Sequence, residues 1–505
     1  ASPKVIKNGL GTDISSWASF DNTDSDAKLV YTLEGVPAGI TLTGSMLKAA
    51  NAATTAGSFT IRVSGAATDN FNAPADVPIT VTAVEKENAG VRLTNAPSSK
   101  TYGDSVKIGQ KLGEVAGGLG CPVHARVLGT VLAIVTRRNA MGTPVTNVVI
   151  ENDGLRTMDD SMKPIAKPLP EATPEEIVEI VREAGISGLG GATFPTYAKI
   201  QSAMGKANLV IVNCAECEPY LTANHRLLLE RGEIVISGME IVMRALGVTE
   251  GILAVEDNKP DAIRLLEDRL KRREGLERGT NLRVCVLRTK YPQGDERQLV
   301  AALLGREIPA GKLPADVGCM ILNAETAAAI SRAYWRGLPL TSRIVTVTGD
   351  CVRNPKNVRA PLGASAQDLI TFCGGLTKTP KKMISGGPMM GFALWDPETP
   401  VSKSMSGLLL FSEEADRPTT VHSPCIHCGR CVSHCPMRLM PNYLAAYAAA
   451  REYEKAEKLD VMSCVECGTC TYNCPAGVEI VQHIRVAKGA IRAKNAAKRG
   501  GGGTK

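Results

Sequence analysis

The amino-acid sequence predicts a multidomain chain of mixed α/β and α+β class. Its 505 residues are enough for roughly three or four domains, and 44% hydrophobic with 22% charged residues is typical of globular proteins. Three observations lead to the fold class. Apolar and polar side chains alternate over residues 1–98, strands alternate with helices from about residue 172, and two cysteine-rich runs follow residue 424.

Composition narrows the functional classes. The net charge of +7 is modest for this length and no nucleic-acid signature accompanies it, so no nucleic-acid partner is expected. No apolar run reaches the roughly 18 residues that a membrane span requires, which predicts a soluble or peripheral protein. The chain is long and many of its 15 cysteines cluster at metal-ligand spacing, which favours a reducing compartment over a secreted disulfide scaffold.

Two β-rich modules are expected first. In residues 1–98, KLVYTLEG, SFTIRVSG and VPITVTAV alternate between turn residues and resemble a bacterial immunoglobulin-like β-sandwich of uncertain role. In residues 99–155, short strands with glycine turns resemble the barrel-sandwich of biotinyl and lipoyl carriers. No lysine stands in a carrier-type Met-Lys-Met turn, so covalent attachment is not expected. His124 is interpreted as a structural or surface residue.

An α/β domain is expected over residues 156–340. TPEEIVEIVREAG begins with a threonine cap and an acidic first turn, then places apolar residues at helical spacing. NLVIVNC, EGILAVED and LRVCVLRT are typical of buried strands, and helical stretches separate them. This alternation predicts a mostly parallel, Rossmann-like sheet. Residues 341–395 return to a compact β pattern that ends in MISGGPMMG.

Residues 410–495 contain the run C-x2-C-x2-C-x3-C-P twice, between short helices. In two-cluster ferredoxins, three cysteines of such a run hold one iron–sulfur cluster and the fourth ligates the other. The first cluster is expected to use Cys425, Cys428, Cys431 and Cys474, and the second Cys464, Cys467, Cys470 and Cys435. Structural zinc is the alternative, but zinc prefers paired C-x2-C knuckles. A flexible tail is expected at residues 496–505.

The stretch GISGLGGATFPTYAKI predicts an anion-binding loop. Gly188, Gly190 and Gly191 permit positive φ and a close approach of backbone N–H groups to an anion. A helix is expected to begin near Pro195, its N-terminus favours phosphate, and Lys199 adds positive charge. Taken alone, such a loop is more often a bare turn.

Four segments in order resemble the NADH-binding flavoprotein subunit of respiratory complex I: the glycine loop, NCAECEP, YPQGDE and NAET. The resemblance implies flavin mononucleotide (FMN) and NAD(H) as cofactors. The residues implied to bind them are Gly188, Gly190, Gly191, Phe194, Lys199, Asn213, Glu216, Glu218, Gly294, Glu296, Asn323 and Thr326. Leu189 and Ala215 depart from the arginine and aspartate of that family.

The roles follow from side-chain chemistry. The two asparagines are expected to bond the edges of a flavin, and the three glutamates to accept hydrogen bonds from ribose or the nicotinamide amide. Phe194 is expected to stack on a ring. Cys214 and Cys217 form one further C-x2-C without a second pair nearby, so they are expected to be buried and structural.

Over residues 104–495 the domain order and the phrases NCAECEPYLTANHRLL, KYPQGDERQL and GGPMMG resemble the RnfC family, which belongs to the Rnf electron-transport complex. The resemblance implies a β-grasp fold for residues 341–395. It also implies a subunit of an ion-translocating ferredoxin:NAD oxidoreductase, with FMN and two [4Fe–4S] clusters. The implied place is peripheral, on the cytoplasmic face of a bacterial membrane, with the other subunits as partners and ferredoxin as an indirect one.

Two other readings stay open. A cobalamin reductase has the same flavin and cluster parts, and a corrin substrate would distinguish it. A non-catalytic relay protein would have a degenerate flavin site, as the departures at Leu189 and Ala215 allow. The usual G-G-x-H-P motif at the start of the family is not found, so the role of residues 1–98 is not implied by the resemblance.

Overall fold

The computed structural model describes strands between residues 4 and 83, and residues 104–114, 118–140, 142–155, 157–273, 280–415 and 423–500. The chain divides into two compact units, Ala1–Arg92 and Leu93–Lys505. Among the described residues no helix is long and apolar enough to cross a membrane.

The first unit consists of strands in its described part. They are β1 (Lys4–Ile6), β2 (Gly11–Asp13), β3 (Leu29–Glu34), β4 (Ile40–Thr43), β5 (Met46–Ala49), β6 (Gly57–Gly65) and β7 (Val77–Ala83). They form one sheet in the order β1-β7-β6-β3 and another in the order β2-β5-β4. The strands that the alternating sequence predicts are present, and the packing of the two sheets as a sandwich stays a prediction.

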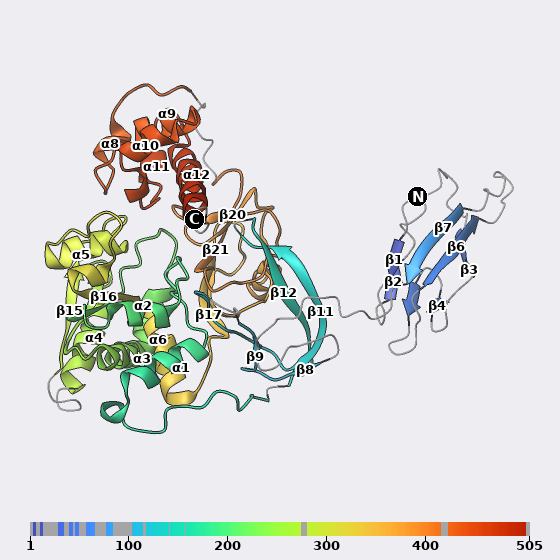
Figure 1. Cartoon of the computed structure of the whole chain (residues 1–505), viewed down its shortest axis with the longest axis horizontal. Helices are drawn as coiled ribbons and strands as arrows, with labels where there is room; N and C mark the ends of the chain where they lie inside the picture. Colours follow the sequence, from blue (N-terminus) through green and yellow to red (C-terminus); the bar gives the residue numbers. More distant parts are fainter. Residues whose placement is uncertain are drawn as a thin grey trace. The chain divides into compact units, whose positions relative to one another are not determined.

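A small β module opens the second unit. Its strands are β8 (Ser105–Val106), β9 (Lys111–Gly113), β10 (Val123–His124), β11 (Gly129–Arg138) and β12 (Pro144–Asn152). The antiparallel pair β11 and β12 forms the longest ladder of the module (Figure 1). The core of the module is formed by Val106, Leu112, Ala125 and Val131. His124 is also buried, so of the two interpretations, structural or surface residue, the structure supports the first.

The α/β domain contains a four-stranded parallel sheet in the order β15-β14-β13-β16. Its strands are β13 (Leu209–Asn213), β14 (Glu250–Glu256), β15 (Asn281–Leu287) and β16 (Cys319–Asn323). Its helices are η1 (Leu169–Glu171), α1 (Pro174–Glu183), α2 (Thr196–Ala203), α3 (Ala223–Leu246), α4 (Pro260–Arg273), α5 (Glu296–Leu304), η2 (Pro314–Val317) and α6 (Ala324–Arg336). The parallel sheet predicted from the sequence is confirmed.

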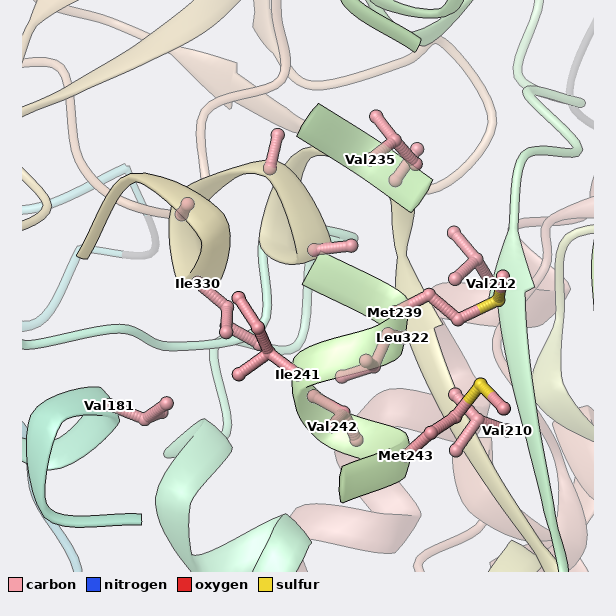
Figure 2. Close-up of a cluster of buried hydrophobic side chains, with 14 of the residues drawn as sticks. Val181, Val210, Val212, Val235, Met239, Ile241, Val242, Met243, Leu322 and Ile330 are labelled. Carbon is pink, nitrogen blue, oxygen red and sulfur yellow. The ribbon is translucent and has the colours of Figure 1, made fainter. Parts of the chain in front are cut away.

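Apolar packing fixes this sheet against α3 and α6. Val210 and Val212 of β13 point toward Met239 and Met243 of α3, and Leu322 of β16 lies beside them (Figure 2). Residues 209–212 of β13 are all buried, which explains why the strand is a continuous apolar run rather than an alternating one. The expected threonine cap of α1 forms a complete capping box.

The following β domain has five strands in the order β18-β17-β21-β19-β20. Its elements are β17 (Ser342–Thr348), β18 (Lys356–Pro361), α7 (Ala366–Phe372), β19 (Lys382–Ser385), β20 (Phe392–Leu394) and β21 (Gly407–Phe411). β21 lies beyond the boundary expected at residue 395, yet it pairs with β17 and β19 at the centre of the sheet. The sequence run GLLLF suits a strand that is buried on both faces.

The cysteine-rich part is helical (Figure 1). Its elements are α8 (Arg430–Ser433), α9 (Pro441–Ala449), α10 (Tyr453–Lys458), η3 (Val461–Ser463), α11 (Thr469–Tyr472) and α12 (Ile480–Gly500). α12 continues through Gly500, so the first residues of the expected tail are helical instead of flexible. Alanine, lysine and arginine, which favour helix, are abundant there. Residues 501–505 lie outside the described residues.

Candidate functional site

Asn213 and Asn323 end two neighbouring parallel strands and lie opposite each other in register. From β13 the chain continues to β14 on one side, and it returns later to β16 on the other side. Ligands of α/β sheets bind at the carboxyl ends of strands where the order reverses in this way. Asn213 Nδ2 donates to the Gly294 carbonyl at 2.8 Å, and Asn323 Oδ1 accepts from Glu325 N–H at 2.9 Å.

The glycine loop lies at the same edge of the sheet. A Cβ atom built on Gly190 would be 3.5 Å from Cβ of Asn323. Gly188 N–H donates to the Phe194 carbonyl at 2.9 Å and closes the loop. Gly191 has φ +117°, a conformation that other residues rarely adopt. α2 begins directly after the loop, as expected, and Phe194 is 45% exposed, so its ring is open to a partner.

Leu189 is held on both sides of its backbone. Its N–H donates to Thr326 Oγ1 at 2.9 Å, and its carbonyl accepts from Arg343 Nη2 at 3.2 Å. Arg343 also pairs with Glu325 at 3.1 Å, and both side chains are almost fully buried. Burial lowers the pKa of Arg343 while Glu325 opposes this effect. At position 189, where the resemblance expects an arginine, the chain therefore has a buried leucine whose N–H and carbonyl groups are both hydrogen-bonded.

Arg343 was not found by sequence reasoning. It lies on β17 of the β domain, more than a hundred residues from the loop that it holds, and no motif marks it. Glu325 lies within the NAET segment but was not singled out. The sequence offers no signal that would pair these two residues, because their contact depends on the packing of two domains.

Lys199 of α2 and Glu296 of α5 form an ion pair. The two residues belong to two separate segments of the resemblance, and the structure brings them together. Lys199 remains 27% exposed at its side chain and Glu296 42%, so each keeps access to solvent. Two of the expected binding residues, one positive and one negative, are thus paired with each other.

Glu216 binds the start of helix α3. Its carboxylate accepts from the backbone N–H groups of Asn224 at 2.9 Å and His225 at 3.0 Å. Burial raises its pKa, and these two hydrogen bonds act in the opposite direction. A carboxylate at a helix N-terminus satisfies N–H groups that have no partner within the helix.

Glu218 connects two domains. Its carboxylate accepts from Met389 N–H at 3.1 Å and Met390 N–H at 2.9 Å, in the GGPMMG loop. A Cβ atom on Gly387 would be only 2.2 Å from Oε2 of Glu218, so a glycine is required there. Burial raises the pKa of Glu218. This link explains a role of the GGPMMG motif that the sequence did not reveal.

Cys214 and Cys217 are held as thiols. Cys214 is fully buried, and burial raises the pKa of each thiol to about 12. Cys217 Sγ accepts from Gly294 N–H at 3.3 Å. The burial of Cys214 and the hydrogen bond of Cys217 within the domain suit structural cysteines.

The cysteines of the two runs line two cavities in sets of four. One cavity, the first cluster cavity, is lined by Cys425, Cys428, Cys431 and Cys474. The other, the second cluster cavity, is lined by Cys435, Cys464, Cys467 and Cys470. Each set combines three cysteines of one run with the last cysteine of the other, which is the arrangement that a two-cluster ferredoxin requires. In number and chemistry, the four thiols of each set match the ligands that one four-iron cluster takes.

The second cluster cavity borders the α/β domain. Tyr291 OH donates to the Cys467 carbonyl at 2.7 Å, and Gln298 Nε2 donates to the Pro436 carbonyl at 3.3 Å. By contrast, Cys425 and Cys428 of the first cavity are exposed. Tyr291 lies in the YPQGDE segment, but the sequence alone indicated no role for this tyrosine.

Models of four domain families match the chain. They are the RnfC barrel sandwich hybrid domain over residues 95–155, the Nuo51 FMN-binding domain over 181–332, the SLBB domain over 344–393 and a 4Fe-4S dicluster domain over 424–479. Among solved structures, an air-oxidised NAD⁺-reducing [NiFe]-hydrogenase is 22% identical with a TM-score of 0.49, over 63% of this chain and 64% of that chain.

Curated relatives are much more similar. The C-subunit of the Na⁺-translocating ferredoxin:NAD⁺ oxidoreductase complex of Acetobacterium woodii is 46% identical over 393 residues, 78% of this chain and 87% of the relative. The C-subunit of the proton-translocating complex of Clostridium ljungdahlii is 41% identical over 402 residues, 79% of this chain and 86% of the relative. The chain belongs to this family of oxidoreductase subunits.

This oxidoreductase subunit therefore contains an FMN-binding domain and a [4Fe–4S] dicluster domain. The four family matches begin at residue 95, so the first unit of the chain is outside them. In the FMN-binding domain, the structure gathers Asn213, Asn323 and the glycine loop at one sheet edge. In the dicluster domain, it gathers the eight expected cysteines into two sets of four.

Proposed function

We propose that this subunit transfers electrons between NAD(H), FMN and two [4Fe–4S] clusters within an ion-translocating ferredoxin:NAD oxidoreductase complex. One observation carries the proposal: the FMN-binding domain is bonded directly to the second cysteine set. Tyr291 OH donates to the Cys467 carbonyl at 2.7 Å. The candidate flavin site and a candidate cluster site thus share a bonded boundary.

The residues at the carboxyl ends of β13 and β16 would hold the flavin. Asn213 and Asn323 offer amide groups, and the loop around Gly191 offers backbone N–H groups to the phosphate. Lys199 adds positive charge, and the exposed ring of Phe194 offers a stacking surface. When bound, FMN accepts the hydride of NADH and supplies single electrons, as iron–sulfur clusters require.

The three glutamates are proposed contacts for the ribose or amide of NADH. Glu216 and Glu218 already accept backbone hydrogen bonds, whereas the carboxylate of Glu296 pairs with a flexible lysine side chain. Glu296 is therefore the carboxylate that can most easily exchange its partner for NADH. Glu218 would act mainly by keeping the GGPMMG loop beside the flavin domain.

The two cysteine sets are proposed to serve in sequence. The second set borders the FMN-binding domain, so it would exchange electrons with the flavin. The first set includes the exposed Cys425 and Cys428, so it would face a partner protein of the complex. We place the protein at the cytoplasmic face of a bacterial membrane as a peripheral subunit, because NADH and reduced ferredoxin are substrates of that compartment.

Cofactor analysis of the purified chain with NADH tests the proposal. We expect one bound flavin, about eight irons, and bleaching of both flavin and cluster absorption after NADH is added. A preparation with full iron, no flavin and no NADH–ferricyanide activity would instead establish a non-catalytic relay protein. Family membership favours the present proposal over a cobalamin reductase.

A further inference from the structure

Lys488 is buried against the second cysteine run. It belongs to α12 and is 5% exposed. Its Nζ atom donates to the Cys464 carbonyl at 2.6 Å and pairs with Glu466 Oε1 at 2.6 Å. Glu466 also accepts from Arg485 Nε at 3.2 Å. Two positive charges and one negative charge are thus fixed beside one corner of the second cluster cavity.

The first run has no counterpart to this charge arrangement among the described residues. His427 occupies the position that corresponds to Glu466, and both residues have similar positive φ values, 55° and 57°. The wall that α9 contributes to the first cavity consists of Asn442 and alanines. Among the described residues that line the two cavities there is no lysine or arginine, and Glu479 lines the first. At the second cavity, however, Lys488 lies behind the lining and is bonded to the Cys464 carbonyl. The two runs share a ligand pattern but differ in the charge around it.

A fixed ammonium group favours the reduced form of a cluster. Reduction adds one negative charge, and a nearby positive charge stabilises it most where water is excluded. Lys488 cannot turn toward solvent without breaking both its hydrogen bond to the Cys464 carbonyl and its ion pair with Glu466. Its charge therefore acts on the second cluster as a permanent part of the site.

We infer that Lys488 is a positioning residue that raises the reduction potential of the second cluster, and of that cluster alone. The inference rests on the proposed function and its ligand sets. It gives a functional meaning to the charge difference between the two runs. The cluster beside the FMN-binding domain becomes easier to reduce than it would otherwise be, so it accepts electrons where they leave the flavin.

Redox titration of the holoprotein, followed by electron paramagnetic resonance, tests this inference. The signal lost in Cys467→Ser identifies the second cluster. In Lys488→Met we expect the reduced-to-oxidised ratio of that cluster, at a fixed potential, to fall about tenfold, which is 59 mV for one electron. The first-cluster signal should not move. Lys488→Arg should restore most of the wild-type potential.

Two further variants sharpen the test. Lys494→Met removes a charge from the same helix that pairs with Glu454 at the surface, so it should move neither signal. Glu466→Gln removes the negative charge and should move the second-cluster signal in the positive direction. Equal shifts of the two cluster signals in a variant would overturn the inference. A second-cluster signal that does not move in Lys488→Met, or does not move in Glu466→Gln, would also overturn it.

Iron content separates this inference from the proposed function. The wild-type protein can contain about eight irons and show two cluster signals, while substitution of Lys488 leaves the reduction potential of the second cluster unchanged. That result contradicts only the role of Lys488. Wild-type protein without two cluster signals contradicts the proposed function itself. Iron analysis of each variant shows whether its cluster is assembled, and Glu466→Gln provides a second test if Lys488→Met does not assemble.

Discussion

Glu218 lies where three parts of the chain meet. It belongs to the NCAECEP segment, it accepts from two backbone N–H groups of the GGPMMG loop, and its neighbour Tyr291 bonds to Cys467. The sequence indicated a functional residue at this position by resemblance alone. The structure adds a physical reason for a carboxylate here, because it accepts hydrogen bonds from two successive backbone N–H groups of the GGPMMG loop.

The Arg343–Glu325 pair shows how a buried charge can shape a binding loop. A buried ion pair costs desolvation of both groups, and it stabilises only when further hydrogen bonds satisfy the remaining donors and acceptors. Here Arg343 also donates to the Leu189 carbonyl, and Glu325 also accepts from the backbone of Ile344. An arginine from another domain thus holds the backbone of Leu189.

His124 predicts a pH dependence of stability. Burial, and then the charges of Lys403 and Lys111, lower its pKa from 6.5 to about 3. The unfolded state therefore binds the extra proton between those pH values, so stability is complete above pH 6.5 and is lost as the pH falls below it. One such group changes the free energy of unfolding by at most about 1.4 kcal/mol per pH unit.

Denaturant unfolding of wild type and His124→Gln at several pH values between 7 and 5 measures this slope. The variant should show a shallower loss of the free energy of unfolding with falling pH, because glutamine has no proton to gain. An identical pH dependence in the two proteins would contradict the assignment.

At the scale of elements, the α/β domain was the most predictable part. Its strands are continuous apolar runs and α1 has a complete cap signal, so both the sheet and the helix start follow from local sequence. β21 was missed because it pairs in parallel with β17, which precedes it by some sixty residues. Such pairing depends on the whole domain and leaves no local turn signal.

The sequence likewise predicted some residues of the candidate site but not the contacts that join its parts. The cysteine sets follow from spacing, because the iron–sulfur ligand pattern is specific, and the structure gathers them as expected. The contacts of Arg343, Tyr291 and Lys488 could not be predicted. Each joins segments that are far apart in the chain or meets a backbone carbonyl, and neither kind of contact has a sequence signature.

The hydrogen bond of Tyr291 predicts how a substitution affects the contact between the FMN-binding domain and the dicluster domain. Tyr291→Phe removes the hydrogen bond to the Cys467 carbonyl and keeps the ring. One such bond contributes about 1 kcal/mol, roughly fivefold in the ratio of docked to undocked dicluster domain. Hydrogen exchange should then increase in the 467–470 region while α3 and α6 stay protected.

A matched change is Tyr197→Phe, which removes a phenol hydroxyl from α2, where Tyr197 packs against the core of the FMN-binding domain. It should leave exchange at residues 467–470 unchanged. If Tyr291→Phe is also silent there, the hydrogen bond does not hold the two domains together.

In the second unit as a whole, the proposed electron route has an order. In that route the FMN-binding domain would exchange electrons with NADH. The second cysteine set lies at its boundary, and Cys425 and Cys428 of the first set are exposed. The relatives are subunits of a sodium-translocating complex in one organism and of a proton-translocating complex in another.

Rapid mixing of the oxidised holoprotein with NADH tests this order most directly, with flavin absorbance and freeze-quenched paramagnetic resonance recorded over time. We predict that the flavin is reduced first, the second-cluster signal follows, and the first-cluster signal appears last. Earlier appearance of the first-cluster signal, or reduced flavin with both clusters still oxidised, would contradict the proposed route.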